Sequence, residues 1–209
     1  VAQKCRLLHG CRRNQRKVNM YRNQQTAIVP GSIGAIAQQS GKSLAESFIS
    51  ADVIAIIDTS GSMASTDSRD GKSRYTVACE ELAALQNSLP GKIAVISFSS
   101  DVQFCPSGVP FQYGAGTDLV RALQFCKVAD VTGMQFVLVS DGEPDQPEKC
   151  IEVAKTYQNR IDVIYVGPER FPTGRDFLVK LASATGGKAV TADRAVELEI
   201  QVMQLLKAG

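Results

Sequence analysis

The chain has 209 residues, of which 44% are hydrophobic and 21% are charged. This length is enough for one good-sized hydrophobic core and excludes two large domains. No stretch approaches the roughly 18 consecutive apolar residues of a membrane-spanning helix. The polar N-terminal segment lacks the apolar run of a secretory signal peptide. We therefore expect a cytoplasmic protein or, alternatively, a component of a virion or another assembled particle.

The formal net charge of +2 is distributed unevenly along the chain. Residues 1–45 contain eight Lys or Arg residues and no Asp or Glu, whereas the rest of the chain holds all 21 acidic residues. The stretch 12–25 shows no apolar periodicity, so we expect it to be flexible or to fold only against a partner. The stretch 32–49 is weakly amphipathic and predicts a helix docked on the remainder of the chain. We expect a basic N-terminal arm over residues 1–50 and one globular domain over 51–209.

The six cysteines are scattered and form no C-x-x-C pair. In a chain that can build a hydrophobic core, this usage is typical of reduced, partly buried thiols in the cytosol. Oxidised pairing is the alternative, with Cys5 and Cys11 as the best-placed partners, within one chain or between two.

From Asp52 onward, short β-branched runs alternate with helical patterns. Strands are expected over residues 53–57, 93–98, 102–104, 136–139, 161–166 and 188–191. Helices are expected over residues 74–89, 118–126 (capped by Thr117), 148–157, 176–184 and 196–206. This alternation predicts an α/β fold, a Rossmann-like three-layer α/β/α sandwich. Its central sheet has about six mostly parallel strands, with 102–104 as a short antiparallel edge strand. In such sheets, ligands bind beyond the carboxyl ends of the strands.

Three polar segments follow predicted strands or begin a predicted helix. They are Asp58-Thr59-Ser60-Gly61-Ser62, Gly114-Ala115-Gly116-Thr117-Asp118 and Ser140-Asp141-Gly142. Together they offer carboxylates and hydroxyls without a thiolate or an imidazole. A donor set made only of oxygens suits a hard cation, and few carboxylates suit Mg²⁺ or Mn²⁺ better than Ca²⁺.

These segments resemble the metal-ion-dependent adhesion site (MIDAS) of von Willebrand factor A (VWA) and integrin I domains. The pattern of that site is D-x-S-x-S, then a Thr, then an Asp, and its five positions correspond to Asp58, Ser60, Ser62, Thr117 and Asp141. The resemblance extends over roughly residues 51–207, because the order of strands and helices also agrees.

The resemblance implies a specific way of binding the ion. Both Ser hydroxyls bind it directly, the Thr and the two Asp side chains bind it directly or through water, and one position stays open for a Glu or Asp of a partner protein. The implied function is a metal-dependent protein-binding module with one Mg²⁺ or Mn²⁺ per domain and no enzymatic activity.

Two other functions stay open from the residues. The first is a structural assembly subunit, of a virion or filament, in which residues 1–50 make the main homo- or hetero-contacts and the metal is incidental. Nucleic-acid binding by the same arm is less favoured, since aromatic residues are sparse there. The second is a metal-dependent hydrolase, for which Asp141, Glu143 and Asp145 supply carboxylates. Because His9 in the arm is the only histidine, the globular domain cannot build a Ser-His or Cys-His nucleophile pair.

Three further motifs are weaker. Ser40-Gly41-Lys42-Ser43 ends like a phosphate-binding loop but has Ile36 where the first glycine belongs. The segment Asp67 to Gly71 lacks the order of acidic residues of a calcium loop. Cys5, His9 and Cys11 offer three zinc ligands at an unusual spacing without an evident fourth.

Overall fold

The computed structural model describes residues 28–111, 114, 116–168 and 173–192. Its centre is a six-stranded sheet with the strand order β3-β2-β1-β4-β5-β6. Strand β3 pairs antiparallel with β2, and the other pairings are parallel. The strands are β1 (Val53–Asp58), β2 (Ile93–Phe98), β3 (Val102–Phe104), β4 (Gln135–Ser140), β5 (Ile161–Tyr165) and β6 (Ala189–Thr191). The predicted mostly parallel sheet with one antiparallel edge strand is confirmed.

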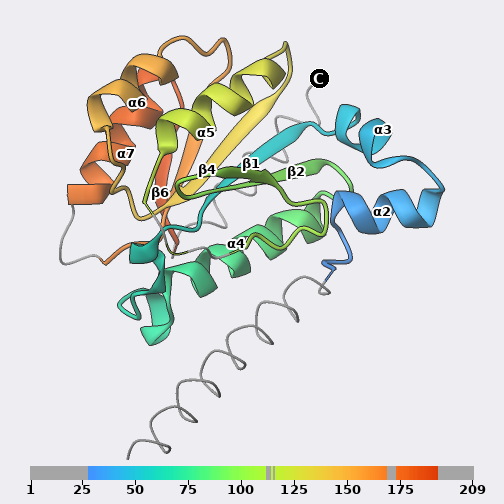
Figure 1. Cartoon of the computed structure of the whole chain (residues 1–209), viewed down its shortest axis with the longest axis horizontal. Coiled ribbons are helices and arrows are strands. Elements are labelled where there is room, and N and C mark those ends of the chain that lie inside the picture. Colours follow the sequence, from blue (N-terminus) through green and yellow to red (C-terminus); the bar gives the residue numbers. More distant parts are fainter. Residues whose placement is uncertain (1–27, 112–113, 115, 169–172, 193–209) are drawn as a thin grey trace, which may run out of the picture.

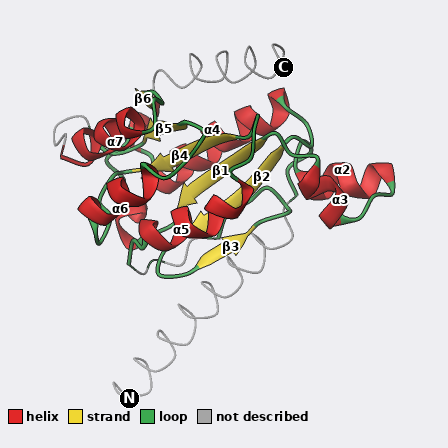
Figure 2. Cartoon of the chain, turned by 90° about the horizontal axis from the view of Figure 1, so that it is seen from above, coloured by secondary structure: helices red, strands yellow, loops and turns green. Residues whose placement is uncertain are grey.

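Helices cover both faces of this sheet (Figures 1 and 2). Helix α4 lies on one face, and α5, α6 and α7 lie on the other. The α-helices are α2 (Ile33–Ser40), α3 (Leu44–Ile49), α4 (Arg74–Ser88), α5 (Leu119–Cys126), α6 (Pro147–Ala154) and α7 (Thr173–Ala184). Three 3₁₀ turns are η1 (Gly61–Ala64), η2 (Arg69–Gly71) and η3 (Lys127–Ala129). The three-layer α/β/α sandwich predicted from the alternating pattern is therefore present.

The continuous apolar sequence of β1 contributes side chains to the hydrophobic clusters on both faces of the sheet. Successive side chains of a strand point to opposite faces of the sheet. Val53, Ala55 and Ile57 thus join the hydrophobic cluster beneath α4. Ile54 and Ile56 join the cluster on the opposite face. A strand buried on both faces needs a continuous apolar sequence, which is what the chain supplies here.

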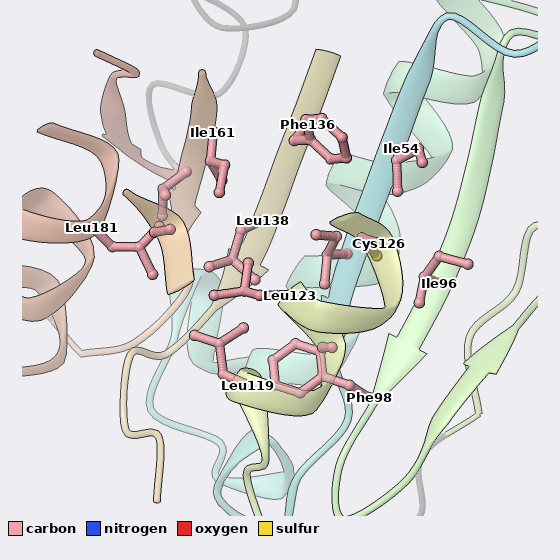
Figure 3. Close-up of a cluster of buried hydrophobic side chains, with 14 of the residues drawn as sticks. Ile54, Ile96, Phe98, Leu119, Leu123, Cys126, Phe136, Leu138, Ile161 and Leu181 are labelled. Carbon is pink, nitrogen blue, oxygen red and sulfur yellow. The ribbon is translucent and has the colours of Figure 1, made fainter. Parts of the chain in front are cut away.

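Helix α5 closes the second cluster near the carboxyl ends of the central strands. Leu119, Leu123 and Cys126 point from α5 toward the sheet, where they meet Phe98 and Leu138 (Figure 3). All five side chains are buried. Each of the leucine and phenylalanine side chains contributes about 1.5 to 3 kcal/mol by leaving water. The segment before α5 is consequently fixed to a rigid layer.

Residues 32–49 form two short helices where the sequence indicated one. Gly41 adopts a left-handed conformation, with φ of 66°, and ends α2. Ser43 then begins α3, because its hydroxyl accepts from the backbone N–H of Glu46 while the Glu46 carboxylate accepts from the N–H of Ser43. The motif that ends like a phosphate-binding loop is thus a helix-to-helix turn. Ile33 of α2 is buried, so this part of the chain packs on the globular body.

Other expectations have mixed outcomes. Helix α5 is capped by Asp118, whose carboxylate accepts from the N–H of Arg121, and not by Thr117 as predicted. The four cysteines that the structure describes are free thiols. No helix within the described ranges is long and apolar enough to span a membrane. Several expectations lie outside the described residues: the stretch 12–25, the closing helix 196–206, the Cys5–Cys11 pairing and the zinc motif around His9.

Candidate metal centre

The candidate site lies where β1 and β4 end. These strands are parallel neighbours, with Ile57 opposite Val139. Asp58 is the last residue of β1, and Asp141 follows Ser140, the last residue of β4. The parallel pairing therefore brings two aspartates from distant parts of the sequence to the same edge of the sheet.

Asp58 is fully buried and held by neutral donors. Its Oδ1 accepts from the N–H of Ser60 at 2.9 Å, and its Oδ2 accepts from the hydroxyl of Ser140 at 2.7 Å. Burial, together with the negative charge of Asp141, raises the pKa of Asp58 to about 6 although these hydrogen bonds oppose the shift. Ionisation of Asp58 in the folded protein therefore costs free energy, and a nearby cation would remove that cost.

The two serines of the first segment lie side by side. The Ser60 and Ser62 hydroxyl oxygens are 3.1 Å apart, within hydrogen-bonding distance. The turn η1 begins immediately after Ser60, and Met63 within it is completely buried in the cluster beneath α4. Met63 therefore anchors the turn that carries both hydroxyls next to Asp58.

Asp141 has one satisfied and one unsatisfied carboxylate oxygen. Its Oδ2 accepts from Nη1 of Arg74 at 2.7 Å. Its Oδ1 is buried and has no hydrogen-bond partner among the described residues. A buried ionised oxygen without a donor costs free energy, and such atoms in native structures call for an explanation such as a missing ion. This oxygen fits a cation site.

Arg74 contacts the candidate site and was not selected by sequence reasoning. Its side chain is only 8% exposed, and it binds Asp67 through two hydrogen bonds, of 2.8 Å from Nε and 2.9 Å from Nη2. The contacts with Asp67 and Asp141 raise the pKa of Arg74 against the effect of burial. One signal was present in the sequence: Arg74 begins α4, where the helix dipole disfavours a cation.

Thr117 is held between the loops that follow β2 and β4. Its N–H donates to Oδ2 of Asp145 at 3.1 Å, and its carbonyl accepts from the N–H of Asp145 at 3.1 Å. The N–H of Asp118 donates to the carbonyl of Ser99. These contacts fix the backbone around Thr117, which is 7% exposed, and they do not engage its hydroxyl.

Gly142 shapes the loop after β4. It adopts a φ of +79°, and a Cβ there would stand 2.1 Å from the carbonyl oxygen of Gly174 in α7. A side chain at this position would both strain the backbone and collide with α7. The close approach of this loop to α7 fixes the backbone next to Asp141.

The five residues that sequence reasoning selected combine two carboxylates with three hydroxyls. Within the described ranges, no group of three or more His, Cys, Asp or Glu side chains is placed to hold a metal ion. A cation at this edge of the sheet would therefore depend on hydroxyl oxygens as much as on carboxylates. That donor set fits Mg²⁺ or Mn²⁺, which prefer oxygen ligands and retain several waters.

The remaining acidic candidates are either bound to other groups or largely exposed to solvent. Asp145 binds the backbone of Thr117, and Asp67 binds Arg74. Glu143 is 62% exposed, and its Oε1 lies 4.0 Å from Nη1 of Arg74. Asp70 is 71% exposed and lies near Lys72, so the segment that echoed a calcium loop is a charged surface turn.

No family model matches the sequence, and no curated protein matches it. Solved structures do match, over about three quarters of the chain. An aerotolerance-related membrane protein from Bacteroides fragilis is 17% identical with a TM-score of 0.59, covering 75% of this chain and 98% of that one. The manganese-loaded TRAP protein of Plasmodium vivax is 17% identical with a TM-score of 0.55, covering 75% and 73%.

A von Willebrand factor type A structure from Catenulispora acidiphila is 16% identical with a TM-score of 0.53. The match covers 74% of this chain and 42% of that one. At these identities the likeness concerns the fold. The chain has a VWA-like fold, in agreement with the resemblance seen in its sequence.

Proposed function

We propose that this chain is a metal-dependent protein-binding module. Asp58, Ser60, Ser62, Thr117 and Asp141 hold one Mg²⁺ or Mn²⁺, and an acidic side chain of a partner protein completes its coordination. The observation that carries the proposal is the buried Oδ1 of Asp141, which lacks a partner among the described residues. It lies at the same edge of the sheet as the Ser60–Ser62 hydroxyl pair.

The charges of the donors favour an acidic partner. When bound, the ion supplies a positive centre with a coordination position open to an incoming carboxylate. Asp58 and Asp141 provide two negative charges, and the hydroxyls of Ser60, Ser62 and Thr117 provide none. Arg74 offsets part of the charge of Asp141. The two carboxylates balance the formal charge of the ion, and Arg74 adds positive charge beside Asp141, so the open coordination position still favours a partner's Asp or Glu.

Recognition is favoured over catalysis by the groups around the site. The chain has one histidine, His9, which lies in the N-terminal arm. Asp145 is bound to the Thr117 backbone, and Glu143 extends into solvent. The manganese-loaded TRAP protein, a neighbour in fold, supports a divalent cation.

Binding of the metal alone is the first test. Electron paramagnetic resonance of Mn²⁺ titrated into the purified full chain is expected to show one bound ion. Asp58→Ala and Thr117→Ala are expected to weaken Mn²⁺ binding at least tenfold, since each removes a ligand. Asp101→Asn is the matched control, because Asp101 is 85% exposed and pairs with Arg121 at the rim. Equal Mn²⁺ binding by all four proteins would contradict the proposal.

Partner capture is the second test. Immobilised wild-type chain in Mg²⁺ is expected to retain a protein from cell extract that EDTA releases. Asp58→Ala should retain none of it, while Asp101→Asn should retain it fully. Capture that persists in EDTA would rule out a metal-dependent contact.

A further inference from the structure

Arg74 faces three carboxylates at once. Its Nη1 lies 2.7 Å from Asp141 and 4.0 Å from Glu143, and its Nε and Nη2 bind Asp67. Among these partners Asp141 has no exposed side-chain surface, whereas Asp67 is 44% exposed and Glu143 is 62% exposed. Arg74 thus reaches from the protein surface to a buried carboxylate of the candidate site.

Arg74 occupies only one side of the Asp141 carboxylate. It donates to Oδ2, while Oδ1 remains buried without a partner among the described residues. The other buried carboxylate of the site, Asp58, accepts hydrogen bonds among the described residues from neutral donors, the Ser60 N–H and the Ser140 hydroxyl. Arg74 is therefore the positive charge that offsets the repulsion between the two aspartates when no ion is bound.

We propose that Arg74 is a built-in countercharge that holds Asp141 in the ion-free protein and competes with the metal ion for that carboxylate. This inference rests on the proposed function. An ion near Oδ1 and the guanidinium at Oδ2 stabilise the same negative charge, and they repel each other. The contact between Arg74 and Asp141 is consequently worth less in the loaded protein than in the ion-free protein.

Thermodynamic linkage converts this difference into a measurable affinity. A change that destabilises the ion-free state more than the loaded state must tighten metal binding. Removing the charge of Arg74 should therefore lower stability without metal and raise the affinity for metal. This sign is opposite to that expected of a residue that only positions Asp141 as a ligand, whose loss would weaken binding.

A substitution at Asp67 is expected to change the metal affinity in the opposite direction to a substitution at Arg74. Its carboxylate takes two of the donors of Arg74 and offsets part of its charge. Replacing Asp67 by Asn leaves Arg74 in place with its charge less compensated, so repulsion of the ion grows. Because Asp67 is partly exposed, solvent screens the effect, and it should be smaller than that of Arg74.

The experiment measures Mn²⁺ affinity by electron paramagnetic resonance and the melting temperature in EDTA and in saturating Mn²⁺. Arg74→Gln is expected to melt below wild type in EDTA, to recover most of that loss in Mn²⁺, and to bind Mn²⁺ roughly tenfold more tightly. Arg74→Lys keeps the charge and should stay within about threefold of wild type. Asp67→Asn should bind Mn²⁺ about threefold more weakly.

Each outcome separates one explanation from the others. Unchanged or weaker Mn²⁺ binding by Arg74→Gln overturns the competition, as does an equal fall in melting temperature with and without Mn²⁺. If Arg74→Gln does not fold, tighter or unchanged Mn²⁺ binding by Asp67→Asn overturns it instead. A wild-type chain that binds no Mn²⁺ overturns the proposed function itself, which distinguishes the two failures.

Discussion

The two ends of β4 carry buried aspartates in opposite electrostatic conditions. Asp130 lies before the amino end of β4, and both of its carboxylate oxygens are satisfied. Oδ2 accepts from Nζ of Lys127 and the N–H of Gln158, each at 2.6 Å, and Oδ1 accepts from the N–H and side-chain amide of Asn159. At the carboxyl end, Asp141 keeps a buried oxygen without a donor among the described residues.

The pKa values reflect this contrast. Burial raises the pKa of Asp130, but the hydrogen bonds from Lys127, Gln158 and Asn159 outweigh it and leave a pKa below the ordinary value. Burial and the charge of Asp141 raise the pKa of Asp58 to about 6. A carboxylate with complete partners stabilises the fold, whereas the pair at the other end lowers stability, a cost that the proposed cation would remove. That difference agrees with a structural role for Asp130 and with the function proposed for the other end.

Asp130→Ala should have the largest effect on stability. It leaves the backbone N–H groups of Gln158 and Asn159 without their acceptor and removes the ion pair with Lys127, which keeps its contact with the Thr156 carbonyl. We therefore expect a loss of about 3 to 4 kcal/mol in the free energy of unfolding. Urea denaturation followed by circular dichroism measures it. The loss should be the same in EDTA and in Mn²⁺. A loss seen in only one of these conditions would contradict the distinction between Asp130, whose contribution is independent of metal, and the Asp58–Asp141 pair.

Asp58→Asn should act in the opposite direction in the ion-free protein. Since the pKa of Asp58 is about 6 when folded and near 3.8 when unfolded, its charge lowers stability progressively as the pH rises from about 4 to 6. Removing that charge should stabilise the protein in EDTA at pH 7 by about 3 kcal/mol and change stability at pH 4 by less than about 1 kcal/mol.

The difference between wild type and Asp58→Asn isolates this residue from other titrating groups. Urea denaturation in EDTA at pH 4, 5, 6 and 7 should show the difference growing with pH. Asp130, with its lowered pKa, gives the reverse dependence, because its contribution is lost as the pH falls below about 4. A stability difference that stays constant across this pH range would mean that the ionised Asp58 carboxylate does not destabilise the fold.

The sequence predicted the fold because its signals are local and repeated. The apolar run of β1 and the segment Asp58-Thr59-Ser60-Gly61-Ser62 follow one another directly, so the end of a buried strand and its polar loop were visible together. The break at Gly41 and the capping by Asp118 were missed because several residues in each stretch could end or begin a helix. Boundaries depend on which of them the tertiary packing selects.

The candidate site was only half visible in the sequence. Its oxygen donors follow a known spacing, whereas the contact of Arg74 with Asp141 joins the start of α4 to the loop after β4, which meet only through tertiary packing. No spacing rule marks such a pair. The complete hydrogen bonding of Asp130 was invisible for the same reason, since Gln158 and Asn159 reach it from the loop before β5.

The smallest effect is expected at the exposed ion pair beside the site. Nη1 of Arg121 lies 2.6 Å from Oδ1 of Asp101, but the two side chains are 56% and 85% exposed. Water and salt screen such a pair, so Asp101→Asn should change the free energy of unfolding by less than about 0.5 kcal/mol. Urea denaturation at low and high NaCl measures it, with any difference vanishing at high salt. A loss as large as that of Asp130→Ala would contradict this expectation. It would mean that a short distance to a cation determines how much a carboxylate contributes to stability in this protein, rather than burial with complete hydrogen bonding.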